Sequence, residues 1–318
     1  MKNILAKKDY SPKASAPEAI ELELPASCAG LRLDQALAGL LHDYSRSRLT
    51  SWIRDERVMV DGRVAQPRDK VRGGERVVVR PGPDPEALAF QPQDIPLDIV
   101  HEDDALIVID KPAGLVVHPG SGNWDGTLLN ALLQHAPALA HVPRAGIVHR
   151  LDKETSGLLV VAKTLTAQTS LVRQLQAHTV SRIYAALAHG RIARAGSVDA
   201  PVGRHPVQRT RMAVVPGGKP AVTHYEIVET YAHATLLRCR LETGRTHQIR
   251  VHLASIGHPL YGDPVYGQRR RLAVPFPRQA LHAQKLTVEH PVSGKPMSWE
   301  SRIPADMRAL IAALKAQP

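Results

Sequence analysis

Four side chains that could take part in chemistry lie within five residues of this chain: His149, Arg150, Asp152 and Lys153. The carboxylate of Asp152 stands between cationic neighbours, and nearby positive charge favours the ionised form of a carboxylate. An ionised carboxylate can attack an electron-poor carbon or stabilise positive charge that develops there. The residues alone also allow a plainer interpretation, because an aspartate flanked by arginine and lysine is often only a salt bridge on a solvated loop.

The segment behind these residues should hold them at the edge of a core element. We expect a turn at Ser156 and Gly157, followed by an apolar run over 158–162 with the length and residue types of a buried strand. Asp152 should therefore lie on a loop at the rim of the core.

The whole stretch HRLDKETSGL resembles the signature HRLD-x-x-T-S/T-G-L of the RluA family of pseudouridine synthases. In that family the aspartate of the motif is catalytic. The resemblance therefore implies that Asp152 is the catalytic residue of an RNA pseudouridine synthase.

Two further segments resemble motifs of the same family. Tyr184 occupies the tyrosine position of a K-x-Y motif whose lysine is replaced by Arg182, and TGRTHQIRVHL contains Arg250 and Leu253. The resemblance implies that Tyr184 stacks on the target uracil, that Arg250 pairs with the catalytic aspartate and that Leu253 lies beneath the uracil. From the residues alone, a single tyrosine in a strand is more often a packing residue.

Three more residues are candidates for substrate binding: Lys111, His149 and Arg150. The resemblance implies that Arg150 enters the space left by a flipped-out base, although an arginine could equally bind a phosphate there. Lys111 belongs to the turn KPAG, which ends an expected strand over 107–109. We expect Lys111 mainly to support this turn beside the cleft, with phosphate contact as a second role.

The chemistry explains why one carboxylate suffices. Pseudouridine formation breaks the bond between ribose C1′ and uracil N1, turns the base and rejoins it through C5. Water must stay out, because its attack would leave an abasic site. Since the reaction is an isomerisation, it requires no ATP, redox cofactor or metal. We accordingly expect no cofactor, and the chain has neither an HExxH motif nor a glycine-rich phosphate loop.

The composition is that of a soluble globular protein with a polyanionic partner. The chain has 318 residues, 43% hydrophobic and 22% charged, with a net charge of +11. Such a surplus of cationic side chains points first to nucleic acid, although a basic surface without a specific partner would give the same number. Two distant cysteines suggest neither a disulfide framework nor a metal site. Without an apolar segment of membrane-spanning length, we expect a cytoplasmic protein that does not interact with membranes.

The chain divides into four expected parts. Residues 1–18 form a basic tail, 19–80 an S4-like RNA-binding domain, 81–95 a proline-rich linker and 96–318 the catalytic domain. The S4 resemblance rests on two short helices, the second capped by Ser45, followed by a hairpin with Asp61-Gly62 at its turn. Where the S4 pattern has a glycine before the first strand, this chain has Glu56.

The catalytic domain should be an α+β pseudouridine synthase fold, a mixed and mainly antiparallel sheet with flanking helices. One of those helices should begin near Thr246, carry Ile249, Leu253 and Ile256 on one side, and end at Gly257. Arginines of both domains are expected to contact RNA, in the S4-like domain and in a basic segment between two strands: Arg32, Arg46, Arg48, Arg204, Arg209 and Arg211.

Within the family, the chain is most similar to the type that modifies uridines of 23S, the large-subunit ribosomal RNA. The expected partner is this RNA or an assembling large-subunit particle. Two alternatives stay open: a family member that acts on transfer RNA or another ribosomal site, and a non-catalytic S4 RNA-binding or assembly factor.

Overall fold

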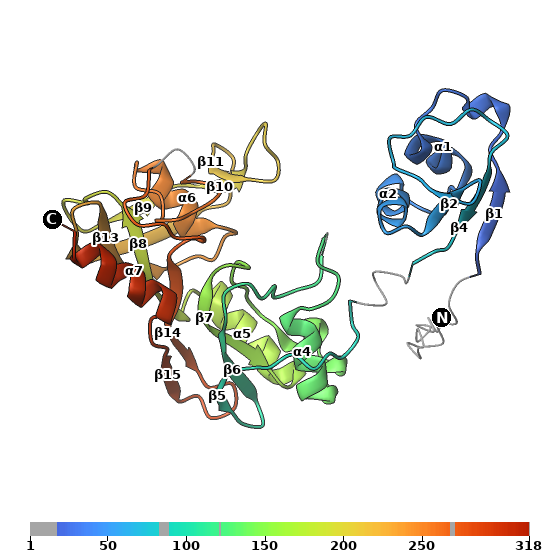
Figure 1. Ribbon diagram of the computed structural model, residues 1–318. Coiled ribbons are helices and arrows are strands. Elements are labelled where there is room, and N and C mark those ends of the chain that lie inside the picture. Colours follow the sequence, from blue (N-terminus) through green and yellow to red (C-terminus); the bar gives the residue numbers. More distant parts are fainter. Residues whose placement is uncertain (1–17, 83–88, 121, 268–270, 318) are drawn as a thin grey trace. The chain divides into compact units, whose positions relative to one another are not determined.

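The computed structural model describes residues 18–82, 89–120, 122–267 and 271–317, and the chain divides into two compact units, 1–88 and 89–318 (Figure 1). Nearly all of the expected tail, 1–18, lies outside the described residues, as does the middle of the expected linker. None of the helices in the described ranges is long and apolar enough to cross a membrane.

The first unit is a small antiparallel sheet with two helices. Its sheet has the strand order β1-β4-β2-β3, and its core contains Leu37, Leu49 and Ile53 from the helices. The elements are β1 (Ile20–Glu23), η1 (Ala26–Cys28), α1 (Leu33–Leu40), α2 (Arg46–Arg54), β2 (Val58–Val60), β3 (Arg63–Val64) and β4 (Arg76–Val79).

The local signals in this unit worked as expected. The Ser45 side chain accepts a hydrogen bond from the backbone N–H of Arg48 at the start of α2, and both turn residues of the hairpin, Asp61 and Gly62, have positive φ. Glu56 has φ 57°, so it adopts the left-handed conformation for which the S4 pattern uses glycine.

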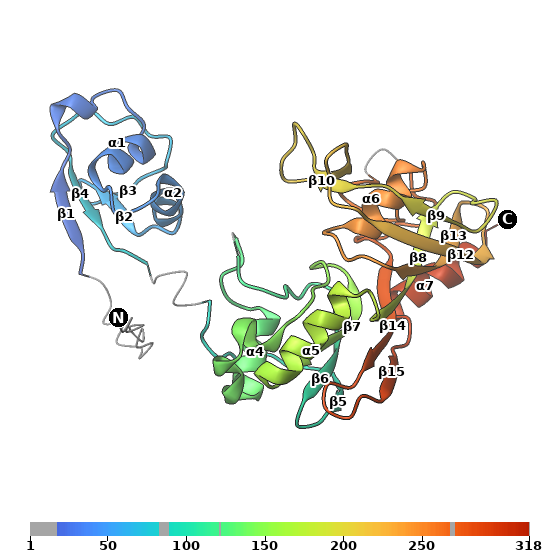
Figure 2. The same cartoon turned by 180° about the vertical axis from the view of Figure 1, so that it is seen from behind.

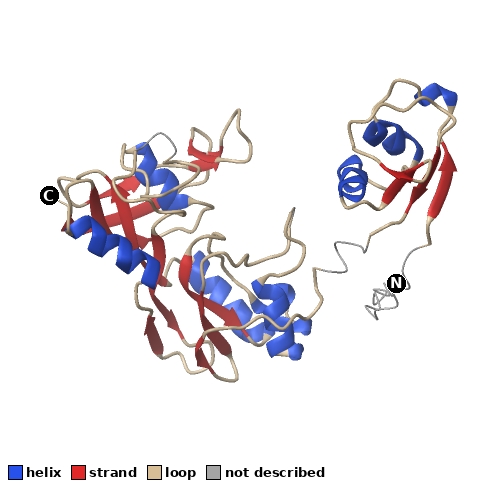
Figure 3. Ribbon diagram, in the orientation of Figure 1, coloured by secondary structure: helices blue, strands red, loops and turns tan. Residues whose placement is uncertain are grey.

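The second unit is built on a nine-stranded mixed sheet with the order β5-β6-β7-β14-β8-β13-β12-β9, in which β15 also pairs with β14 (Figures 1 and 3). All named pairs are antiparallel except β7 with β14. The predicted α+β class with a mainly antiparallel sheet is confirmed. The strands are β5 (Ile99–Glu102), β6 (Leu106–Lys111), β7 (Ser156–Ala162), β8 (Ser181–His189), β9 (Gly196–Asp199), β12 (Val222–Thr230), β13 (Ala234–Leu241), β14 (Leu281–Glu289) and β15 (Pro296–Glu300), with a separate hairpin of β10 (Val202–Arg204) and β11 (Met212–Val214).

Helices cover both faces of this sheet, which explains why β7 is buried along its whole length. Leu159 and Val161 join the core that contains α4 and α6, whereas Leu158 and Val160 join the core that contains α5. The helices are α4 (Leu128–His135), α5 (Leu165–Gln176), α6 (Gln248–Ser255) and α7 (Ala305–Lys315), with 3₁₀ turns η2 (Pro137–His141) and η3 (Pro143–Gly146) (Figure 2).

Two local expectations were wrong. Ser156 and Gly157 do not form a turn but begin β7 itself, where Gly157 pairs with Ala283 of β14. At this crossing a Cβ on Gly157 would lie 2.3 Å from the Ala283 carbonyl oxygen, and φ is +112°. Helix α6 begins at Gln248, close to the expected start, but it ends at Ser255, so that Ile256 lies at its C-cap and is 38% exposed instead of continuing the side of Ile249 and Leu253.

Candidate active site

Asp152 lies on the loop between η3 and β7, with a side chain that is 15% exposed. Its neighbours fix the loop by their backbone carbonyls. Lys153 accepts hydrogen bonds from the Gly114 N–H and the Lys111 ammonium, and Glu154 accepts one from Arg278. The loop is therefore held firmly, while the Asp152 carboxylate stays partly open to solvent.

Lys111 supports this loop from below. Its Nζ donates to the carbonyls of Pro112, Leu115 and Lys153 at 2.7, 2.9 and 3.0 Å, and the residue is fully buried. Burial lowers the pKa of Lys111 to about 8, against the opposing charges of Glu154 and Asp152. Because every ammonium hydrogen has a carbonyl acceptor, the phosphate contact considered for Lys111 is not available. The residue positions the Asp152 loop.

His149 also has a supporting role. Its Nε2 accepts the backbone N–H of Val160 at 3.1 Å, which attaches the HRLD segment to β7. Burial, and secondarily the charge of Arg182, lowers the pKa of His149 to about 3, so the ring is neutral and can accept this bond. This bond gives His149 a role in holding the segment through Nε2, and its expected contact with the substrate stays a prediction. Arg150, the next residue, is exposed.

Arg250 reaches Asp152 from α6. Its Nη1 lies 3.1 Å from Asp152 Oδ2, while Nε and Nη2 bind the two oxygens of Asp263 at 2.7 and 3.0 Å. Burial alone would lower the pKa of Arg250, but the hydrogen bonds and charges of Asp263 and Asp152 outweigh it, and the pKa is raised. The expected pairing of Arg250 with Asp152 is present in the geometry. Asp263, which completes it, was not among the candidates.

Internal hydrogen bonds fix α6 against the sheet. The buried amide of Gln248 donates to the Val222 carbonyl and the Thr223 hydroxyl. His252 is fully buried between Thr223 Oγ1 and the Ala200 carbonyl, each 2.9 Å from a ring nitrogen. Arg250 is therefore presented by a helix that cannot slide along the sheet.

A second chain of contacts, also missed from the sequence, leads to the same carboxylate. His247 Nε2 lies 3.8 Å from Asp152 Oδ1, and His247 Nδ1 lies 2.9 Å from the Tyr266 hydroxyl. That hydroxyl accepts the backbone N–H of Met212 at 3.0 Å. The phenol can then donate to Nδ1, which leaves the proton of a neutral His247 on Nε2, facing Asp152. Burial lowers the pKa of His247, which favours this neutral form, although Asp152 opposes the shift.

Tyr184 and Leu253 belong to the apolar core beside this site. Tyr184 is 6% exposed on β8, and Leu253 on α6 is fully buried. Burial raises the pKa of Tyr184, with Asp152 adding to the shift and Arg182 opposing it, so the phenol is protonated at neutral pH. Arg182, in the lysine position of the K-x-Y motif, donates to the Glu242 carbonyl at 3.2 Å.

The candidate RNA-binding arginines fall in both units. In the first unit, Arg32 and Arg46 share the buried carboxylate of Asp34, with side chains that remain 38% and 47% exposed. Arg48 lies on the same helix as Arg46. In the second unit, the β10–β11 hairpin carries the others: Arg204, Arg209 and Arg211. Within the described residues, no group of three His, Cys, Asp or Glu side chains could hold a metal ion.

The comparisons with known proteins identify the class of enzyme. The RNA pseudouridylate synthase family matches residues 105–255, and the S4 domain family matches residues 31–77. The chain belongs to the family of RNA pseudouridine synthases.

Similar proteins cover the chain from end to end. It is 58% identical, over 100% of its length and 94% of the relative's, to the ribosomal large subunit pseudouridine synthase D of Nitrosomonas europaea. The protein of that name from Escherichia coli is 57% identical over 90% of this chain and 91% of its own length. Among solved structures, human RNA pseudouridylate synthase domain containing 1 is similar with a TM-score of 0.55 and 26% identity, over 71% of this chain and 97% of its own.

Proposed function

We propose that this protein converts specific uridines of large-subunit ribosomal RNA to pseudouridine, with Asp152 as the catalytic carboxylate. The observation that carries the proposal is the position of Asp152, partly open to solvent yet bound by Arg250. The choice of RNA is supported by 58% identity, over the whole chain, to a relative named for the ribosomal large subunit. Such a substrate, free or in an assembling particle, implies that the protein works in the cytoplasm.

In the proposed mechanism Asp152 acts at C1′ of a uridine that has left the RNA helix. The carboxylate attacks C1′ or stabilises its positive charge while the bond to N1 breaks. The freed uracil turns between Tyr184 and Leu253, and C5 bonds to C1′. The proton on C5 is then lost, and N1 carries a proton in the product. Arg250 orients the carboxylate throughout, and Arg150 occupies the space that the base leaves.

The loss of the C5 proton provides the test. RNA tritiated at C5 of uridine releases tritium only when the new carbon–carbon bond forms. We expect release from large-subunit ribosomal RNA and not from bulk transfer RNA. Asp152→Asn, which keeps the size of the side chain, should abolish release while leaving RNA affinity nearly unchanged. Asp104→Asn, a matched change at an exposed turn, should keep full activity.

Each other outcome decides against part of the proposal. Release from transfer RNA alone would retain the mechanism and replace the substrate. An active Asp152→Asn variant would remove Asp152 from the catalytic role. Tight binding without release from free ribosomal RNA or a precursor particle would identify a non-catalytic RNA-binding factor.

A further inference from the structure

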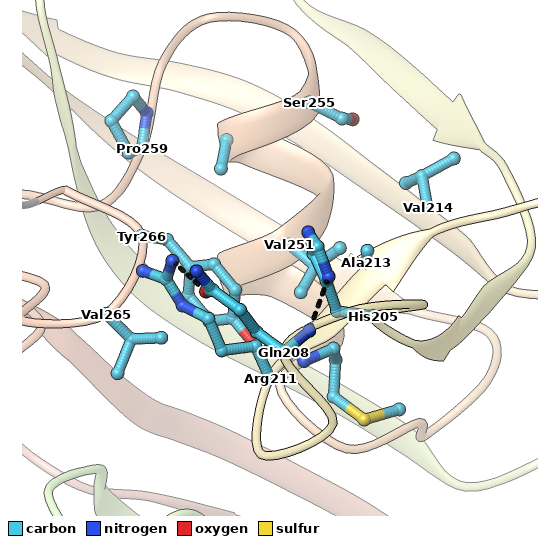
Figure 4. A pocket seen from close by; sticks show the side chains of 12 residues that line it. His205, Gln208, Arg211, Ala213, Val214, Val251, Ser255, Pro259, Val265 and Tyr266 are labelled. Atoms are coloured by element: carbon cyan, nitrogen blue, oxygen red, sulfur yellow. Dashed lines mark hydrogen bonds between the residues drawn. The ribbon is translucent and has the colours of Figure 1, made fainter.

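A cavity of about 870 Å³ lies between the β10–β11 hairpin and α6, next to the candidate active site (Figure 4). One wall comes from the helix and the segment after it, and the other comes from the basic hairpin. Tyr266 lies in its lining and is also the residue whose hydroxyl contacts His247. No step of the proposed mechanism uses this space.

The lining combines apolar surface with hydrogen-bond donors. Val251 and Ala254 line the helix side beside Ser255, and the hairpin side joins His205, Gln208 and Arg211 to the apolar run 212–214. His205 Nδ1 accepts the backbone N–H groups of Val207 and Gln208, so its other nitrogen carries a proton and can donate. Gln208 Oε1 accepts from Arg211, which leaves the amide hydrogens of Gln208 for a ligand. Apolar surface together with several donors suits a flat heteroaromatic ring with polar edges.

The position of Tyr266 connects this cavity to the site of reaction. The guanidinium carbons of Arg250 and Arg211 lie 5.1 and 5.7 Å from the centre of its ring. One of these arginines binds Asp152 and the other lines the cavity. In Figure 4 the side chains of Tyr266, Gln208 and Arg211 lie together, with Arg211 in contact with both of the others. Tyr266 thus lines the cavity and also contacts His247 and Arg250, the two residues nearest the Asp152 carboxylate.

We propose that this cavity binds the base of a second nucleotide of the RNA, one that flanks the target uridine and is unstacked with it. The inference rests on the proposed function. The basic hairpin attracts the polyanion, the volume accepts a nucleobase with its ribose, and the site lies where the strand must continue on either side of a flipped uridine.

The test uses the shortest ribosomal hairpin that the wild-type protein modifies, together with copies that carry an abasic nucleotide at each flanking position. Ala254→Trp fills the cavity, and Gln208→Ala removes a donor without adding bulk. Ala254→Ser and Val207→Ala are the matched controls, since Val207 is 83% exposed and lies on the same turn outside the lining. The affinity of each protein variant for each RNA is measured, and tritium release at saturating RNA gives kcat.

We expect Ala254→Trp to weaken binding of the intact hairpin by about tenfold, the scale of one lost base-stacking contact, with kcat close to that of the wild type. One of the abasic RNAs should bind the wild-type protein more weakly than the intact hairpin does, by a similar factor. The same abasic RNA and the intact hairpin should bind Ala254→Trp with equal affinity. Gln208→Ala should lose part of the same factor.

The inference would be overturned if the wild-type protein bound every abasic RNA as tightly as the intact hairpin. It would also be overturned if the losses of affinity caused by the abasic nucleotide and by Ala254→Trp were additive. Either result would leave an active enzyme. Absence of tritium release from every ribosomal RNA tried would instead contradict the proposed function. The same affinity comparison, made on the hairpin that the wild-type protein binds most tightly, would then still decide whether the cavity binds a base.

Discussion

Asp263 binds Arg250 through two hydrogen bonds and leaves the guanidinium one nitrogen for Asp152. Oδ1 of Asp263 also accepts the backbone N–H groups of Val265 and Tyr266, and its side chain is completely buried. The aspartate is therefore fixed by the chain itself, and Arg250 is fixed by the aspartate. This order of support explains how a charged side chain on α6 can be held in a buried position with its tip directed at Asp152.

Replacing Asp263 by Asn should therefore destabilise the protein and impair catalysis. The variant leaves a buried guanidinium with one carboxylate instead of two, and breaking a buried pair costs about 3–5 kcal/mol. Denaturant unfolding measures the loss, and tritium release at low temperature measures the catalytic defect in the folded fraction. Glu300→Gln, which breaks the exposed pair with Lys285, should cost at most about 1 kcal/mol. An equally small effect for both variants would contradict this account.

Removing the hydroxyl of Tyr266 should affect the rate more than RNA affinity. Tyr266→Phe retains the ring between the two arginines but deprives His247 Nδ1 of its donor and the Met212 N–H of its acceptor. We expect kcat to fall by about tenfold, the effect of misdirecting a single hydrogen-bonded group worth about 1.4 kcal/mol. Tyr231→Phe, which removes a hydroxyl bound to Glu229, serves as the control and should keep its rate. A purely structural Tyr266 would lower the unfolding midpoint without changing kcat.

Substituting Lys111 by Met should lower the unfolding free energy by roughly 3 kcal/mol or more. The methionine fills most of the volume but leaves the carbonyls of Pro112 and Leu115 without this donor, at about 1–3 kcal/mol for an unsatisfied buried group. Activity should fall in the same variant, because the Lys153 carbonyl keeps only the Gly114 N–H and loses the ammonium. Lys163→Met, a less buried lysine paired with Glu102, is the comparison for stability. A Lys111→Met protein of normal stability with weakened RNA binding would restore the phosphate role.

The depressed pKa of His149 predicts a stability loss at mildly acidic pH. The pKa of His149 is about 3 in the folded chain and near 6.5 in the unfolded chain. Below pH 6.5, His149 therefore binds a proton in the unfolded chain but not in the folded chain. The unfolding free energy should therefore fall as the pH drops from about 6.5 towards 3, with a slope of at most about 1.4 kcal/mol per pH unit from this group. In His149→Gln the slope should decrease by the contribution of about one bound proton. Denaturant unfolding at several pH values measures this slope. An unchanged slope would mean that the ring titrates normally.

Most of the structure that the sequence predicted correctly rests on local signals. Ser45 as a helix cap, the Asp61-Gly62 turn and the apolar run of β7 are decided by neighbouring residues, and the structure confirms them. His247 was missed as part of the site because its partner Tyr266 lies 19 residues further on.

The support of the site was hidden for the same reason. Asp263 lies in the turn-like segment GDPVYG, and only the fold brings it under Arg250. Lys111 did carry a usable signal, since a lysine directly after an apolar strand either reaches solvent or must find several acceptors. Its carbonyl partners come partly from Lys153, which no sequence pattern links to it.

The parallel contact of β7 with β14 consists of two residue pairs, Ser156 with His282 and Gly157 with Ala283. A sheet joined by so few residue pairs at one place resists bending along its strands but allows β7 and β14 to move relative to each other. Asp152 lies on the loop before β7, and Arg250 lies on α6 on the other side of this contact. The 3.1 Å hydrogen bond between them therefore joins the two halves of the sheet. On warming, the hydrogen bond between Asp152 and Arg250 should lengthen before either half of the sheet unfolds. Catalytic activity should therefore fall at a lower temperature than the midpoint of unfolding.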